Sequence, residues 1–154
     1  MIRLIMLIAS GGGVGYLPIA PGTWGSLIAL PVNLLLLRLP GLGYPLALAG
    51  IFWLAVYTAG AAEKITDRKD PGLVVIDEVI GMLIALIGVP IHPLPWLLAF
   101  GLFRLFDIVK PWPVSWADRH LNGGLGIVLD DVLAGGYAWI VLRVILASFP
   151  KLAA

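Results

Sequence analysis

Three of the chain's long intervals without a charged residue constrain it more than any other feature of its sequence. They run over residues 39–62, 79–103 and 132–142. A helix that crosses the hydrocarbon core of a bilayer needs about 20 predominantly apolar residues. Charged residues make up only 12% of the chain, whereas soluble domains contain about 25%. The pattern predicts an all-α, multi-pass membrane protein, and 154 residues suit a single domain over 1–154.

The interval 79–103 is interrupted near its middle by Pro90, Pro93 and Pro95. Prolines this close cannot lie inside one regular helix, because each removes a backbone donor and clashes with the preceding turn. We therefore expect two short helices joined by a turn, each about 20 Å long and shorter than the ~30 Å hydrocarbon core. The sequence as a whole predicts a bundle of about four to five helices, near 27–39, 42–62, 77–89, 95–108 and 132–149.

This hairpin determines which loops share a side of the membrane. It brings segments 11–26, 63–78 and 107–131 to one side, and the last two contain all nine acidic residues. If 79–103 were a single span, the acids would be divided between the two faces. Most Lys and Arg residues outside the predicted helices lie on the acid-rich side as well, and positive loops face the cytoplasm. We expect the motif loops to be cytoplasmic.

Charge and cysteine content exclude several classes of function. The net charge is +1, from ten Lys and Arg against nine Asp and Glu. Binding to nucleic acid needs clustered cations that neutralise phosphates, so no nucleic-acid partner is expected. The chain has no cysteine, which excludes disulfides, Cys-ligated metals and cysteine nucleophiles.

Paired acids occur twice, each time before an apolar segment. Asp77-Glu78 opens one predicted helix and Asp130-Asp131 another, and a glycine follows each pair four or five residues later. Capping and the helix dipole account for acids at a helix start. However, glycines let two helices approach closely, which would bring four carboxylates together. Carboxylates at close quarters repel one another unless a divalent cation neutralises them, so a Mg²⁺ site is the stronger interpretation.

Two further segments contain groups suited to phosphate. Arg104, Asp107 and Lys110 are spaced to share one helix face at the end of an apolar segment, where ionisable residues are usually functional. Thr23 and Ser26 lie in a Pro-Gly-rich segment just before an apolar run. There they could cap the helix or help its N-terminus bind phosphate. Together these patterns predict Mg²⁺-dependent phosphate chemistry at a membrane surface.

Four motifs resemble the phosphatidylglycerophosphatase A family in the family's order. They are Pro-Gly-Thr-Trp-Gly-Ser at 21–26, Val-Ile-Asp-Glu-Val-Ile-Gly at 75–81, Phe-Arg-Leu-Phe-Asp-Ile-Val-Lys-Pro-Trp-Pro at 103–113 and Gly-Gly-Leu-Gly-Ile-Val-Leu-Asp-Asp-Val-Leu-Ala-Gly at 123–135. The resemblance implies a Mg²⁺-dependent enzyme of the bacterial cytoplasmic (inner) membrane. Such an enzyme hydrolyses phosphatidylglycerophosphate to phosphatidylglycerol and phosphate. Asp70 and Asp118 also match the family pattern.

The resemblance does not assign individual roles, so the roles that follow are hypotheses. We expect Arg104 and Lys110 to bind the phosphate and stabilise its charge. Thr23 and Ser26 are further candidates for phosphate contact, and Asp118 for proton transfer. The predicted metal ligands are Asp77, Glu78, Asp107, Asp130 and Asp131, and Arg104, Asp107, Lys110 and Asp118 are the predicted catalytic residues.

Other membrane-protein classes fit the sequence less well. The Asp-x-x-Asp-Gly-x-x-Ala-Arg signature of CDP-alcohol phosphotransferases and the Ser-Gly-His motif of acid-phosphatase-like lipid phosphatases are both absent. A cation transporter would place its acids at mid-membrane along helices, whereas here they gather at helix ends.

Overall fold

The computed structural model describes residues 1–153, and its regular structure over that range is entirely helical. This confirms the all-α class. The described residues form seven α-helices, more than the four to five expected, with short 3₁₀ turns at Val14–Tyr16 and Pro150–Ala153. The helices are α1 (Ile2–Ala9), α2 (Pro21–Leu36), α3 (Gly43–Thr66), α4 (Ile76–Ala85), α5 (Pro93–Val109), α6 (Val114–His120) and α7 (Gly123–Ser148).

The additional helices are short, and two expected boundaries shift because motif segments are helical. The helices α1 and α6 were not predicted. The helix α2 begins at Pro21 instead of near 27, with proline at a position where its missing N–H has no partner to lose. The helix α7 begins at Gly123 instead of near 132. Asp130 and Asp131 therefore lie more than one turn inside α7, and the expectation that they open a helix was wrong.

The expected hairpin between the fourth and fifth helices is confirmed. The helix α4 ends at Ala85 and α5 begins at Pro93, so the proline-rich turn separates two short helices. Pro93 and Pro95 lie in the first turn of α5, where their missing N–H groups would have had no intrahelical acceptor. The turn therefore restricts α4 to ten residues, about 15 Å of helix.

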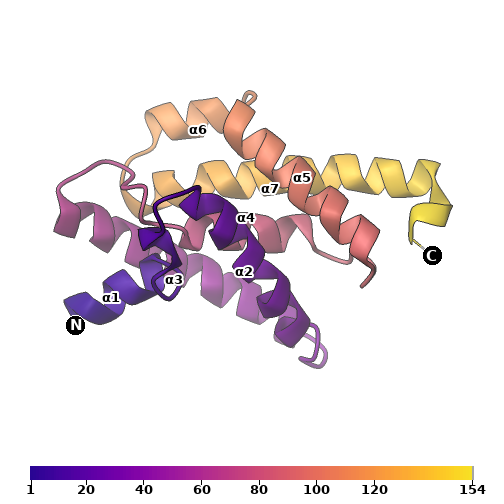
Figure 1. The fold of residues 1–154 in the computed structure, drawn as a ribbon, viewed down its shortest axis with the longest axis horizontal. Coiled ribbons are helices and arrows are strands. Elements are labelled where there is room, and N and C mark those ends of the chain that lie inside the picture. Colours follow the sequence, from indigo (N-terminus) through magenta and orange to yellow (C-terminus); the bar gives the residue numbers. More distant parts are fainter. Residues whose placement is uncertain (154) are drawn as a thin grey trace.

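The short helix α4 lies at the centre of the fold. It packs against α7, α2, α3 and α5, and eight of its ten residues are buried. In Figure 1 it lies among these helices, while the chain termini lie at opposite ends of the molecule. A helix this apolar and this enclosed is a core element, so its polar first turn is buried with it.

Glycines allow α7 to pack closely on its neighbours. A Cβ atom at Gly135 would collide with the carbonyl oxygen of Gly81 in α4. At the start of α7, a Cβ at Gly124 would collide with the carbonyl oxygen of Val56 in α3. The backbones meet without intervening side chains, as small residues permit at membrane helix interfaces. The close approach expected from the glycines after the paired acids is thus present in the structure.

The outer surface of the bundle is strongly apolar. The helices α3 and α7 are both long and apolar enough to cross a membrane. On α3, Leu46, Trp53 and Tyr57 are more than 60% exposed. Further exposed apolar side chains lie on α1, α5 and α7, among them Leu4, Leu97, Ile108, Ile140 and Val144.

Candidate functional site

A cavity of about 260 Å³ opens where the first turns of α2 and α4, the end of α5 and the first half of α7 meet. The sequence motifs converge here because α4 packs against α2, α5 and α7. The charged residues that line the cavity are Asp70, Asp77, Glu78, Arg104, Asp107, Lys110, Asp130 and Asp131. The expectation that the acids of separate segments gather at one site is therefore met.

Three of these carboxylates form a compact group. One oxygen atom from each of Asp77, Glu78 and Asp131 lies within 4.8 Å of the others. Asp77 and Glu78 come from the first turn of α4, and Asp131 from the interior of α7. Gly81 follows Asp77 by four residues and Gly135 follows Asp131 by four, so the glycine contact lies one turn below the acids. The close helix crossing brings the three carboxylates together.

Burial makes this group electrostatically costly without a cation. Asp77 and Asp131 are 6% and 4% exposed. Burial raises the pKa of Asp77 well above its usual value, and the neighbouring Glu78 carboxyl raises it further. Burial also raises the pKa of Glu78 to about 7, although the hydrogen bond with Asp77 and the charge of Arg104 oppose the shift. Oδ1 of Asp77 and Oε2 of Glu78 have no hydrogen-bond partner among the described residues.

The donor set matches a hard divalent cation. Buried charges are normally paired or bound to metal, and carboxylate oxygens are the ligands that Mg²⁺ takes in proteins while it retains several waters. Unpartnered buried oxygens beside a cavity of about 260 Å³ leave room for such waters. The residues present therefore fit a Mg²⁺ ion.

Arg104 faces the same cavity and is held by its neighbours. Its Nη1 lies 2.6 Å from Oδ2 of Asp107, one helical turn away on α5. The same Nη1 lies 3.5 Å from Oγ of Ser26, which is fully buried and donates to the carbonyl oxygen of Gly22. Arg104 and Asp107 thus share one face of α5, as their spacing predicts, but they pair with each other in this structure. Ser26 contacts the arginine and does not itself line the cavity.

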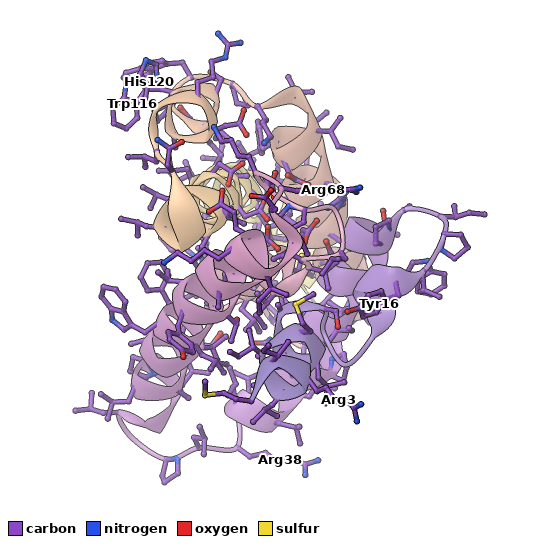
Figure 2. All side chains as sticks on the ribbon, turned by 90° about the vertical axis from the view of Figure 1, so that its left-hand side faces the viewer. Arg3, Tyr16, Arg38, Arg68, Trp116 and His120 are labelled. Atoms are coloured by element: carbon purple, nitrogen blue, oxygen red, sulfur yellow. The ribbon has the colours of Figure 1, made fainter. Side chains whose placement is uncertain are left out.

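Lys110 bridges two acids. Its Nζ lies 2.7 Å from Oδ1 of Asp118 on α6 and 2.7 Å from Oδ2 of Asp130 on α7. Desolvation lowers the pKa of Lys110, but these two ion pairs outweigh it and raise the pKa above its usual value. Lys110 lies just beyond the end of α5, with a φ of 47°. Of the ten Lys and Arg residues, Arg104 and Lys110 alone line the cavity among the residues described. The labelled Arg3 and Arg38 project outward from the molecule (Figure 2), and Arg68 is exposed.

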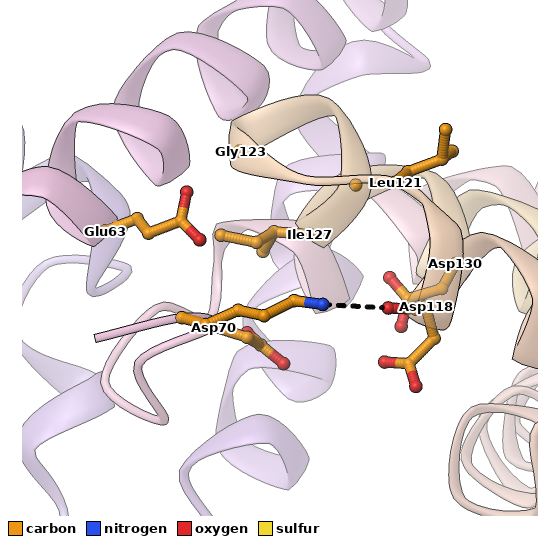
Figure 3. A pocket seen from close by; sticks show the side chains of 9 residues that line it. Glu63, Asp70, Asp118, Leu121, Gly123, Ile127 and Asp130 are labelled. Carbon is orange, nitrogen blue, oxygen red and sulfur yellow. Dashed lines mark hydrogen bonds between the residues drawn. The ribbon is translucent and has the colours of Figure 1, made fainter.

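A second, much smaller cavity of about 20 Å³ adjoins the first. Asp70 and Asp130 line both cavities, whereas Asp118 lines only the smaller one (Figure 3). The Nζ of Lys69 lies 3.5 Å from the carbonyl oxygen of Asp118. A space of this size holds about one water molecule.

Asp70 and Gly22 are two of the lining residues that received no role from the sequence. Asp70 lies in the loop before α4, and only its match to a family motif marked it. Gly22 lies at the start of α2, where a Cβ atom would collide with Oε1 of Glu78 and approach Nη1 of Arg104 to 3.2 Å. The motif 21–26 thus brings helix backbone to the cavity, while the side chains of Thr23 and Ser26 lie outside it.

Comparisons with known proteins show which sequences this chain is similar to. The sequence model of the family described as phosphatidylglycerophosphatase A matches residues 7–146. A phosphatidylglycerophosphatase A of Escherichia coli is 42% identical over 84% of this chain and 76% of its own length. One of Haemophilus influenzae is 40% identical over 92% and 88%. A Bacteroides thetaiotaomicron protein, named as a candidate phosphatidylinositol-3-phosphatase, is 39% identical over 92% of both chains. No solved structure matches significantly.

Proposed function

Because the chain belongs to the phosphatidylglycerophosphatase A family, we propose that it hydrolyses phosphatidylglycerophosphate to phosphatidylglycerol and inorganic phosphate in phospholipid biosynthesis. One observation carries this proposal. Three carboxylates within 4.8 Å of one another share a cavity with one guanidinium and one ammonium group. Hydrolysis of a phosphomonoester needs cations around the phosphate oxygens. This cavity supplies two cationic side chains and a group of carboxylates that can bind a metal cation.

We propose Mg²⁺ as the cofactor and Asp77, Glu78 and Asp131 as its principal ligands. Asp130 and Asp107 complete the predicted ligand set, although in this structure they pair with Lys110 and Arg104. When bound, the ion supplies charge neutralisation and Lewis-acid polarisation of a phosphoryl oxygen.

The protein's own cations hold the phosphate in this proposal. Arg104 and Lys110 bind the equatorial oxygens and stabilise the charge that builds there during transfer. Asp107 and Asp118 orient these two cations through their ion pairs. Ser26 positions Arg104 instead of contacting phosphate. The backbone N–H of Gly22, in the first turn of α2, provides the helix N-terminal donor that was expected near Thr23.

The substrate is a lipid, and the exposed apolar surface suits a membrane enzyme. We propose that α3 and α7 span the bacterial cytoplasmic (inner) membrane as part of a multi-pass, single-domain bundle. Their length, about 36 Å and 39 Å for 24 and 26 residues, exceeds the hydrocarbon core of ~30 Å. The proposed active site faces the cytoplasm, because the acid-rich loops also carry most of the loop cations.

Phosphate release from phosphatidylglycerophosphate in detergent micelles tests the proposal. We expect release in the presence of Mg²⁺ and none with EDTA, and the variant Asp131→Asn should lose activity with the metal present. Asp67→Asn is the matched control, since Asp67 lies in the same charged region but lines neither cavity. A wild-type protein that is folded yet releases no phosphate would overturn the proposed function. Phosphate release that persists in EDTA would overturn the proposed Mg²⁺ cofactor and leave the phosphatase activity in place.

Two other lipids test the choice of substrate. Phosphatidate carries a terminal phosphate without the glycerol spacer, and phosphatidylinositol 3-phosphate is suggested by the name of the Bacteroides relative. We expect kcat/KM to be highest for phosphatidylglycerophosphate. Faster hydrolysis of the inositol lipid would support the phosphatase activity but overturn phosphatidylglycerophosphate as the substrate.

A further inference from the structure

The acids that line the main cavity are not equivalent. Asp77, Glu78 and Asp131 form the metal-binding group, while Asp107 pairs with Arg104 and Asp130 with Lys110. Asp70 is the sixth acid of the cavity, and its carboxyl forms no side-chain hydrogen bond or ion pair within residues 1–153. Among the six acids of the cavity, Asp70 is therefore the one whose carboxyl group is not engaged with a cation or with the metal-binding group, so it can donate a proton.

The position of Asp70 suits proton exchange with both substrate and solvent. It lies in the loop between α3 and α4 with a φ of 45°, a conformation that favours Asp and Asn among residues other than glycine. It is exposed and lines both the main cavity and the smaller cavity that has room for a water molecule. A proton given up in the main cavity can thus be replaced from solvent.

The charged groups around Asp70 come from several elements. They are Lys110 beyond α5, Asp118 of α6, Asp107 of α5 and Glu63 of α3, together with Asp77 of α4 and Asp130 of α7, with which the Asp70 charge also interacts. Desolvation by the cavity walls raises the pKa of Asp70, the Lys110 ammonium opposes this shift, and Asp118, Asp107 and Glu63 reinforce it. A raised pKa keeps a larger fraction of the carboxyl protonated near neutral pH, as an acid catalyst requires.

The two cations of the cavity do not stabilise the leaving group of the proposed reaction. In the loose transition state of phosphoryl transfer, the bond to the leaving oxygen is largely broken before the new bond forms. Arg104 and Lys110 bind the equatorial oxygens, so the glycerol oxygen of the departing lipid is left with growing negative charge. An alkoxide is a poor leaving group, and a positioned acid that protonates it contributes about 10²- to 10⁴-fold in rate.

We propose that Asp70 is the general acid that protonates the leaving glycerol oxygen. This inference rests on the proposed function. As water attacks phosphorus and the phosphorus–glycerol oxygen bond breaks, the Asp70 proton moves to that oxygen and completes the hydroxyl of phosphatidylglycerol. The attacking water leaves one proton, which passes through solvent and restores the Asp70 carboxyl. This assignment takes proton transfer from Asp118, which pairs with Lys110 and does not line the main cavity.

The variant Asp70→Asn tests the inference through the leaving group. Asparagine tolerates the same backbone conformation but cannot donate a carboxylic proton. We expect the turnover of phosphatidylglycerophosphate to fall about 10²- to 10⁴-fold. An aryl phosphate that carries an alkyl chain releases a phenolate without help from an acid, so the variant should hydrolyse it at close to the wild-type rate. Asp67→Asn, a second loop aspartate with positive φ, should leave both rates unchanged.

Two further measurements separate proton transfer from a structural role. Wild-type kcat for the natural lipid should fall at alkaline pH as Asp70 loses its proton, and this limb should be missing in Asp70→Asn. Mg²⁺ binding, measured by calorimetry on the metal alone, should be the same in both proteins.

The outcomes distinguish this inference from the function on which it rests. Equal losses on the alkyl and aryl substrates, or a weakened Mg²⁺ affinity in Asp70→Asn, would overturn the role of Asp70 and leave the phosphatase intact. Wild-type protein without activity on phosphatidylglycerophosphate would instead overturn the proposed function.

Discussion

Gly135 of α7 lies directly against the backbone of Gly81 in α4, so that a Cβ atom at Gly135 would collide with the Gly81 carbonyl oxygen. This contact lies one helical turn from Asp77 and Asp131, and it sets the distance between them. The proposed metal-binding group therefore depends on a close helix crossing that only glycine permits. Both helices carry the same four-residue spacing from acid to glycine.

Gly135→Ala should destabilise the protein and weaken its metal site together. The added methyl group meets backbone, which cannot move aside as a side chain can, and such overpacking costs about 1–3 kcal/mol. Alanine is otherwise the better helix former, so a loss of stability in this variant would come from the clash at the helix crossing. Thermal unfolding in detergent and Mg²⁺ titration would measure the two effects. Gly136→Ala is the matched control, because its Cβ would meet nothing within 4 Å, and a melting temperature as low as that of Gly135→Ala would contradict the argument.

The crossing also shows how far the sequence could predict the site. The repeated spacing of paired acids and glycines indicated that two helices would meet with their acids together, and the structure confirms this for Asp77 and Asp131. The sequence placed Asp130 and Asp131 at a helix start. In the structure α7 begins earlier, because the glycines at 123, 124 and 126 are part of the helix and pack against α3 and the loop before α7. Glycine weakens a helix by propensity, and tertiary contacts overrule that preference here.

The place of Asp70 could not have been predicted in the same way. No periodic pattern positions a loop carboxyl, and its positive φ depends on how the loop between α3 and α4 is held. Part of that support comes from a backbone hydrogen bond of 2.9 Å between Val75 and Ala9 in α1, a helix that the sequence did not predict. Similarly, Ser26 has the residue type of a phosphate ligand, and only the structure shows its hydroxyl bonded to helix backbone.

Gly22→Ala should impair catalysis more than folding. Its Cβ would press on Oε1 of Glu78 and on Nη1 of Arg104. These are ends of side chains that can move, so we expect the melting temperature to change little while kcat/KM falls by about tenfold or more, because a small displacement of the binding groups slows the reaction. Gly101→Ala on α5, whose Cβ would meet nothing within 4 Å, should leave both values unchanged. A normal kcat/KM in Gly22→Ala would show that the start of α2 does not shape the site.

Arg104→Lys should lower kcat/KM although the positive charge remains. Lysine provides a single ammonium group, whereas the planar guanidinium can contact Asp107, Ser26 and a phosphate oxygen with separate N–H groups. Loss of one transition-state donor reduces rates by about 10²- to 10³-fold. Steady-state kinetics with phosphatidylglycerophosphate would measure the effect, and Arg119→Lys on exposed surface serves as the control. Equal activity of both variants would exclude a specific role for the guanidinium group.

The pH dependence of metal binding should follow Glu78. Its pKa is raised from an ordinary 4.5 to about 7 in the metal-free protein, so below pH 7 a bound proton competes with the ion for the carboxylate. The apparent Mg²⁺ affinity should weaken as pH falls through 7, by roughly tenfold per pH unit where one proton is displaced. Calorimetric titration from pH 5.5 to 8.5 would measure it, and Glu78→Gln should bind more weakly with a flatter profile.

The same group gives the metal-free protein the opposite trend in stability. Between about pH 4.5 and 7 the folded state holds a proton on Glu78 that the unfolded chain releases, so this group's contribution to stability declines as pH rises through that window. Bound Mg²⁺ replaces the proton and should abolish the decline. Melting temperatures recorded across this window with EDTA and with Mg²⁺ would show it. If the two series ran parallel with pH, Glu78 would not be a ligand, because a metal that leaves its protonation unchanged does not bind its carboxylate.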